Sequence, residues 1–160
     1  MEGGVYHAFA RGNDRQQIYR DDFDRNRYLR LLGRVVKQKS WRCLGYCLMD
    51  NHVHLLAETP RGDLSSGMQW LHGIYGRVFN VRHGRIGHLF QGRYGAVRMT
   101  SNAQTVAAST YIAMNPVEAG ICQRPSQYQW SSYGALMSDA APDWLDTELL
   151  QGSDPGRGIA

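Results

Sequence analysis

The chain has 160 residues, of which 42% are hydrophobic and 20% charged, as is typical of one soluble globular domain. It contains no apolar run long enough to span a membrane and no segment laid out like a signal peptide, so we expect a cytoplasmic protein without a membrane partner. Three cysteines without a Cys-x-x-Cys pair exclude a disulfide framework and a zinc ribbon. Cys43 and Cys47 share parity on a predicted strand, so we expect both to pack on one face.

The basic residues point to a polyanionic partner. The net charge is +4, and 16 of the 18 basic residues are arginine, which binds phosphate in a bidentate manner. Residues 64–117 contain no aspartate or glutamate, but they contain five arginines: Arg77, Arg82, Arg85, Arg93 and Arg98. This distribution favours contact with a nucleic acid. The alternative is a solvated face with chance spacing.

The first half of the chain predicts three strands and one helix. An aromatic-rich run at 5–11 predicts a strand, and an aspartate-capped amphipathic segment predicts a helix over about 22–39. The helix has a buried stripe at helical spacing: Tyr28, Leu31, Leu32 and Val35. Two further strands at 41–49 and 52–59 flank an Asp-Asn turn signal and are expected to form a hairpin.

The second half predicts two more helices and one strand. Asp63 is expected to cap a helix whose inner face consists of apolar residues at helical spacing. These are Leu64, Met68, Leu71, Tyr75 and Val78. A strand is expected over 89–99, where Gly92 and Gly95 indicate bulges or a close approach of backbone. A third helix is expected over about 102–114.

The order β-α-β-β-α-β followed by a helix predicts an α+β fold. We expect a ferredoxin-like antiparallel sheet with helices on one face, an open opposite face and an additional C-terminal helix. A single domain is expected over 1–135. The chain after Gly120 is expected to be irregular, to pack through Trp130 and Trp144, and to end in a flexible tail within an extension at 136–160.

His52 and His54 form the first candidate metal site. They lie two apart on a predicted strand, so both imidazoles leave the same face while Val53 points into the core. Two neutral imidazoles side by side can bind a divalent metal. Taken alone the pair is weak support, because two polar residues on an exposed face give the same pattern.

Tyr111 and Asn115 form the second half of the candidate site. They are four apart on the predicted third helix and share a face. A tyrosine can act as a covalent nucleophile, and an asparagine carbonyl is a hard oxygen ligand for Mg²⁺ or Mn²⁺. However, Asn115-Pro116-Val117-Glu118 also fits the start of a further helix, with asparagine as the N-cap and proline at the first position. Alone, the sequence favours this capping role, and the two roles can coexist.

Five segments carry a family resemblance. In chain order they are Y-H-A-F-A-R-G-N-D, L-M-D-N-H-V-H-L-L, G-H-L-F-Q-G-R-Y, Y-I-A-M-N-P-V-E-A-G and Y-Q-W-S-S-Y. Together they closely resemble the small insertion-sequence transposases of the single-tyrosine HUH type (His, hydrophobic, His). The branch resembled is the one associated with repetitive extragenic palindromes. The resemblance covers roughly residues 3–135.

The resemblance implies roles for four residues. His52 and His54 would be the HUH metal ligands for Mg²⁺ or Mn²⁺, Asn115 the third ligand, and Tyr111 the nucleophile. The implied reaction is cleavage and rejoining of single-stranded DNA beside a hairpin. The tyrosine hydroxyl attacks the scissile phosphate, which gives a 5′-phosphotyrosine link and a free 3′-hydroxyl.

Alternatives remain beside this transposase. One is a replication initiator or relaxase with the same HUH chemistry, and another is a non-catalytic ferredoxin-like module that binds a DNA or RNA hairpin. Relatives include monomers and homodimers that exchange the tyrosine helix. The short connection before the third helix favours a helix that stays with its own chain.

Further residues are candidates for DNA contacts or rival roles. The predicted phosphate contacts are Arg11, Arg77, Arg82, Arg85, Arg93 and Arg98. Tyr94 either stacks on an unpaired base or packs in the protein. Tyr75 is a rival nucleophile, but its place on an apolar stripe favours the core. His7 is expected to be structural or to contact DNA rather than to bind metal, and His72 and His83 are expected at the surface.

Overall fold

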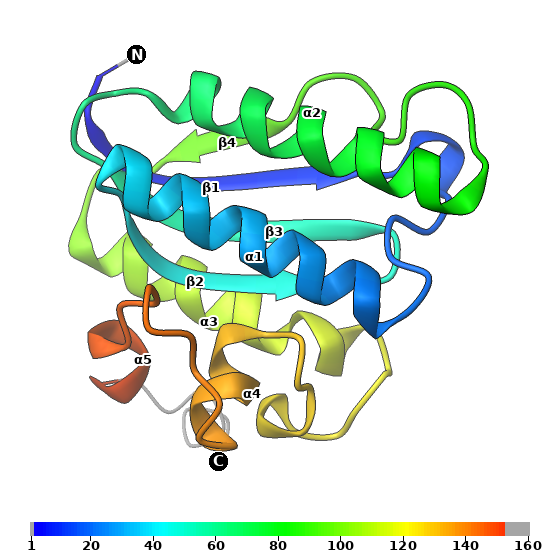
Figure 1. The fold of residues 1–160 in the computed structure, drawn as a ribbon. Coiled ribbons are helices and arrows are strands. Elements are labelled where there is room, and N and C mark those ends of the chain that lie inside the picture. Colours follow the sequence, from blue (N-terminus) through cyan, green and yellow to red (C-terminus); the bar gives the residue numbers. More distant parts are fainter. Residues whose placement is uncertain (1, 153–160) are drawn as a thin grey trace.

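The computed structural model describes residues 2–152, so the end of the predicted flexible tail, residues 153–160, lies outside the described part. The described chain is an α+β fold with a four-stranded antiparallel sheet, which confirms that part of the prediction (Figure 1). The elements are β1 (Gly4–Arg11), η1 (Asn13–Arg15), α1 (Asp22–Lys39), β2 (Arg42–Leu48), β3 (His52–Thr59), α2 (Leu64–His83), β4 (Gly95–Arg98), α3 (Asn102–Glu118), η2 (Pro125–Gln127), α4 (Ser132–Met137) and α5 (Glu148–Gly152). None of the helices among them is long and apolar enough to cross a membrane.

The strands lie in the order β2-β3-β1-β4. β1 pairs with both β3 and β4, and β2 pairs with β3, so the two longest strands occupy the centre of the sheet. Helices α1 and α2 cover one face, and α3 lies on the other (Figure 1). The expected open face is therefore wrong in part, because α3 packs against β2 and β3 there.

The alternation of β3 decides which side chains meet α3. Val53 belongs to the main core with α1 and α2, whereas Leu56 belongs to a second cluster with Ile112 of α3. Successive side chains of a strand point to opposite faces. His52 and His54 have the parity of Leu56, so they leave the sheet on the α3 face.

The two cysteines of β2 pack on opposite faces, contrary to the parity argument. Cys43 belongs to the main core, and Cys47 to the cluster under α3. The register of β2 against β3 shifts between Cys43 and Gly45. A β-bulge of this kind inserts one residue and inverts the alternation beyond it.

Helix α1 has the predicted range, and α2 begins directly after Asp63, as predicted. Asp21 caps α1 by accepting a hydrogen bond from the N–H of Asp24 at 3.1 Å. Asp63 stands at the N-cap position of α2, but its carboxylate accepts from the indole N–H of Trp41 at 2.7 Å and makes no capping bond. At the other end of the α2 stripe, Phe79 is buried in place of the predicted Val78.

The fourth strand is shorter than predicted, with four residues at Gly95–Arg98. The preceding residues form an irregular segment, in which Gly92 has a φ of +63°. One isolated bridge, between Gly12 and Phe90, ties this segment to the end of β1. At Gly95 the backbone lies close to the side chain of Phe9, as expected, because a Cβ there would be 2.4 Å from the Phe9 ring.

The segment after α3 packs on the main core through its tryptophans, as predicted. Trp130 and Trp144 both contact the core cluster, and Trp144 fills the space beside Gly33. An ion pair between Arg42 and Asp146 fixes the segment to β2 at 2.9 Å. The segment also forms the short helices α4 and α5, which the sequence did not predict.

Candidate active site

Three elements bring the candidate residues together on the α3 face of the sheet. β3 contributes His52 and His54, β1 contributes His7, and α3 contributes Tyr111 and Asn115. The rings of His52 and His54 are 5.1 Å apart between centroids, at an interplanar angle of 87°. The sequence prediction thus placed the two histidines, the tyrosine and the asparagine in one site, and the structure adds His7.

The imidazole of His52 lies between two amide oxygens. Its Nδ1 is 2.8 Å from Oδ1 of Asn51, and its Nε2 is 3.1 Å from Oδ1 of Asn115. Both oxygens are acceptors, so a neutral His52 that donates from Nδ1 directs the lone pair of Nε2 at the lone pairs of Asn115. A cation beside Nε2 and Oδ1 would remove this repulsion.

Asn115 is not an N-cap, and the capping interpretation is wrong. Helix α3 continues through Pro116 to Glu118, so Asn115 lies in its interior. Its backbone carbonyl accepts a hydrogen bond from the N–H of Ala119 at 3.0 Å. The side chain is therefore free of a capping role and points at His52.

His54 is the more buried of the two histidines, with 8% of its surface exposed. Burial lowers its pKa to about 3, and His7 and His52 nearby act in the same direction. The imidazole is therefore neutral at pH 7, which is the form that binds metals. Its Nδ1 lies 3.0 Å from Nε2 of His7, so its own Nε2 is the nitrogen left for a ligand.

His7 is the site residue that the sequence reasoning did not assign to the metal site. It lies on β1 opposite Leu56, which makes it a diagonal neighbour of His54 across the antiparallel pair. Strand alternation places His7 on the face opposite Tyr6, Ala8 and Ala10, which are buried, but its contact with His54 depends on the pairing of β1 with β3. Burial lowers the pKa of His7 as well.

Tyr111 stands over the histidines with an accessible side chain. Its ring centroid is 5.7 Å from that of His54 and 5.9 Å from that of His7, and 52% of the residue is exposed. It reaches the histidines of its own chain, because α3 starts soon after β4 ends. A substrate phosphate can therefore approach both the hydroxyl and the histidines.

The donor set fits a divalent cation. Imidazole nitrogens bind divalent metal ions, and an amide oxygen is the kind of hard ligand that Mg²⁺ and Mn²⁺ prefer. Ligands bound at about 2.1 Å in an octahedral shell are separated by about 3 Å along each edge. The separation of 3.1 Å between His52 Nε2 and Asn115 Oδ1 matches such an edge. No group of three His, Cys, Asp or Glu side chains within residues 2–152 is arranged to hold a metal.

Tyr75, the rival nucleophile, belongs to the core. It is 1% exposed, and its hydroxyl donates to the backbone carbonyl of Ile18. Burial raises its pKa far above the ordinary value for tyrosine. Tyr75 therefore cannot present a hydroxyl to DNA in this fold.

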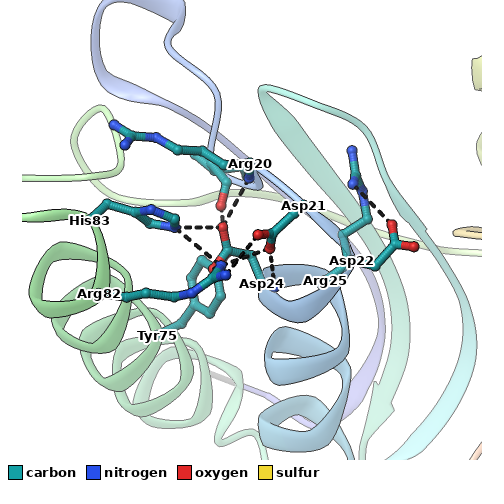
Figure 2. A network of polar contacts seen from close by, with 9 residues as sticks. Arg20, Asp21, Asp22, Asp24, Arg25, Tyr75, Arg82 and His83 are labelled. Atoms are coloured by element: carbon teal, nitrogen blue, oxygen red, sulfur yellow. Dashed lines mark hydrogen bonds and ion pairs between the residues drawn. The ribbon is translucent and has the colours of Figure 1, made fainter.

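Several of the predicted phosphate contacts are held by the protein itself. Arg82 pairs with Asp21 and Asp24, at 2.7 and 2.8 Å, and joins the end of α2 to the start of α1 (Figure 2). Arg98 pairs with Glu2 at 2.6 Å. Arg85 donates to the carbonyls of the loop after α2 and to two side-chain amides.

The histidines of α2 are not the surface groups that the sequence suggested. His72 accepts or donates a 3.0 Å hydrogen bond with the hydroxyl of Tyr28 and stacks on Phe90, with centroids 4.1 Å apart. His83 lies 2.8 Å from the buried carboxylate of Asp24, in the network of Figure 2. Both histidines flank the apolar stripe of α2, and their burial depends on contacts with α1 and, for His72, with Phe90, which the sequence of α2 alone does not reveal.

The comparisons with known proteins agree with this geometry. The family described as IS200-like transposases matches residues 2–115. The chain belongs to the IS200-like transposase family. The matched range begins before β1 and ends at Asn115, so this transposase family match spans every residue of the site above.

Two solved structures resemble this transposase in fold. A REP-associated tyrosine transposase bound to a REP hairpin has a TM-score of 0.70 and 18% identity, over 93% of this chain and 92% of that one. A transposase from Deinococcus radiodurans R1 has a TM-score of 0.51 and 19% identity, over 70% of this chain and 90% of that one. No curated protein matches the chain.

Proposed function

We propose that this transposase cleaves and rejoins single-stranded DNA beside a hairpin, through a 5′-phosphotyrosine intermediate. The observation that carries the proposal is the contact between the two halves of the site. His52 Nε2 lies 3.1 Å from Asn115 Oδ1, while Tyr111, one helical turn before Asn115, stands over His54. The REP hairpin bound by the similar solved structure supports a hairpin as substrate.

Each residue has a distinct part in the proposed reaction. The hydroxyl oxygen of Tyr111 attacks the scissile phosphorus, the bond to the 3′ oxygen breaks, and the proton of the tyrosine ends on the released 3′-hydroxyl or in solvent. The 5′ phosphate stays bound to Tyr111 until a 3′-hydroxyl from another strand reverses the step. The phosphotyrosine ester conserves the energy of the broken bond, so no nucleotide cofactor is needed.

His52, His54 and Asn115 would hold Mg²⁺ or Mn²⁺. When bound there, the cation supplies Lewis-acid polarisation of the phosphate and stabilises the developing charge. Asn51 would accept a hydrogen bond from Nδ1 of His52, and His7 would accept one from Nδ1 of His54. Each imidazole would then be kept in the tautomer whose Nε2 is free to bind the cation.

The finer description of the fold belongs to the same proposal. We infer a split βαβ, ferredoxin-like sheet, which the strand order β2-β3-β1-β4 and the crossover helices α1 and α2 support. We assign the catalytic domain to residues 1–135 and treat 136–160 as its C-terminal extension.

The test is formation of a covalent protein–DNA adduct. The intact chain is incubated with a labelled single-stranded hairpin DNA and Mn²⁺, and the adduct is detected on a denaturing gel. We expect an adduct with the unmodified chain and none with Tyr111→Phe. Tyr75→Phe is the matched control, since it removes a buried hydroxyl remote from the site, and it should leave the adduct in place.

Two results would count against the proposal. An adduct that survives Tyr111→Phe and disappears with Tyr75→Phe would overturn the assignment of the nucleophile. Tight hairpin binding without an adduct under Mg²⁺ or Mn²⁺ would favour a non-catalytic binding module. A replication initiator or relaxase would share the adduct and differ in the DNA that it selects.

A further inference from the structure

A cavity lies outside the candidate active site, between α2 and the irregular segment that precedes β4. Its volume is about 560 Å³, and its lining contains no aspartate or glutamate. The segment is tied to β1, because the N–H of Gln91 donates to the carbonyl of Arg11 at 2.8 Å. Arg11 is paired with His52 in the sheet register, so the wall of the cavity begins one strand away from a candidate metal ligand.

The arginines of the acid-free stretch divide into two groups. Arg82, Arg85 and Arg98 are held by protein carboxylates, amides or carbonyls. Arg77 and Arg93 form no hydrogen bond or ion pair with any residue in 2–152, and both line this cavity. The two arginines of this stretch that have no protein partner thus border the same cavity, so both are available to bind phosphate there.

The inner wall of the cavity is aromatic and neutral. Phe90 stacks on His72 at an interplanar angle of 16°, and burial lowers the pKa of His72 to about 3, so the ring carries no charge at pH 7. Tyr94 is half-buried beside them, and its hydroxyl has no partner among the described residues. A nucleic acid base, which has an apolar face and a polar edge, matches this wall.

Glycines keep the helical side of the cavity open. Gly73 and Gly76 lie inside α2, where glycine is the poorest helix former after proline. A Cβ at Gly73 would have no atom within 4 Å, so no packing contact requires the glycine. The missing side chain therefore leaves space in the cavity, which a larger residue would fill.

We propose that this cavity binds an unpaired nucleotide of single-stranded DNA, with Arg77 and Arg93 on its flanking phosphates and its base against Phe90 and Tyr94. The choice of DNA as the ligand rests on the proposed function. The cavity then acts as an anchoring site beside the C-terminal end of β1, distinct from the place where the strand is cut. It fixes the path of the strand before the scissile phosphate reaches Tyr111.

The test measures binding of a 5′-fluorescein-labelled dT12 strand to the intact chain by anisotropy, in EDTA so that no cleavage occurs. We expect Arg93→Gln to weaken binding about tenfold, the loss of one charge-assisted hydrogen bond. It should also reduce the slope of log K against log salt by about 0.7, the value for one phosphate contact on a single strand. Arg34→Gln removes the same charge from the exposed side of α1 and should have little effect on either quantity.

A substitution series at Gly73 separates blocking of the cavity from damage to the fold. Alanine and leucine both favour the helix, so both variants should melt at or above the temperature of the unmodified chain. Gly73→Ala should keep most of the dT12 affinity, whereas Gly73→Leu should lose about tenfold, as for one unstacked base. A loss of binding in a protein that has become more stable cannot come from unfolding.

The inference is overturned if dT12 does not bind, if Arg93→Gln and Arg34→Gln weaken it equally, or if Gly73→Leu binds as tightly as the unmodified chain. These outcomes are independent of the adduct assay. If the Arg93 and Gly73 variants weaken dT12 binding but no adduct forms, the inference is supported and the proposed cleavage is contradicted. If the adduct forms normally and these variants bind dT12 like the unmodified chain, only the inference is contradicted.

Discussion

His7 offers the sharpest test of how the candidate metal site is built. The proposed arrangement has His54 donating from Nδ1 to Nε2 of His7 across 3.0 Å, which leaves His54 Nε2 unprotonated for the cation. His7→Phe keeps a ring of similar size and removes the acceptor. His54 can then place its proton on Nε2, the nitrogen that the metal needs.

The expected size of the effect follows from this single contact. Loss of an outer partner of a metal-bound histidine costs about 10- to 100-fold in metal affinity, or about 1.4 to 2.7 kcal/mol. His7→Gln retains a carbonyl acceptor on a flexible side chain, so it should restore part of the affinity. If His7 acted only by packing, the His7→Phe variant would bind the metal more tightly than the His7→Gln variant.

The assay is titration of the DNA-free protein with Mn²⁺, followed by electron paramagnetic resonance of the free ion. Nitrogen-15 NMR of the metal-free protein reports the tautomer of His54 separately. His88→Phe is the matched control, since His88 is exposed, lies in the segment between α2 and β4 outside the candidate active site, and should leave Mn²⁺ affinity unchanged. If His7→Phe binds Mn²⁺ as tightly as the unmodified chain, the positioning role is refuted.

Three further predictions concern the site and the fold around it. Asn115→Ala should lower Mn²⁺ affinity at least about tenfold while the helix content in circular dichroism stays constant, because alanine is a better helix former than asparagine; unchanged affinity would remove Asn115 from the ligand set. Asp24→Ala should lower the free energy of unfolding, measured by urea denaturation, by about 3 kcal/mol. This is near the low end for a broken buried ion pair, because Arg82 keeps Asp21 as a partner. A change below about 0.5 kcal/mol, typical of exposed surface sites, would contradict the network in Figure 2. The pKa of His72 is about 3 in the folded chain and 6.5 as the reference value, so the unfolded chain binds more protons between these limits and stability should fall as pH falls from 6.5. His72→Phe should make the loss of stability between pH 6.5 and pH 4 shallower by up to about 1.4 kcal/mol per pH unit, and an unchanged pH dependence would contradict the burial of His72.

The sequence predicted the elements whose signals are local. Helix α1 has a capping aspartate and a regular apolar stripe, and β3 has strict boundaries set by the turn at Asp50 and the loop after Thr59. His52 and His54 were placed on one face because strand alternation needs no knowledge of the partner strand. The family motifs then supplied the link between β3 and α3, which no local rule contains.

The errors came from features that depend on tertiary contacts. The bulge that separates Cys43 from Cys47 is a property of the pairing between β2 and β3, and it is invisible in either strand alone. Asn115-Pro116 fits a helix start by composition, yet the contact with His52 and the packing of α3 on the sheet favour a continuous helix. The role of His7 likewise required the register of β1 against β3.

The continuity of α3 has a consequence for regulation of the site. Tyr111 and Asn115 are one turn apart on a single helix, so no rigid motion of α3 can withdraw the proposed nucleophile and leave the proposed third ligand behind. Docking of the helix and loading of the proposed metal are thermodynamically linked, because a cation that contacts Asn115 adds its binding free energy to the docked state. A bound cation would add to the packing of Ile112 that already holds α3 on the sheet, so loading of the proposed metal would further stabilise the position of Tyr111.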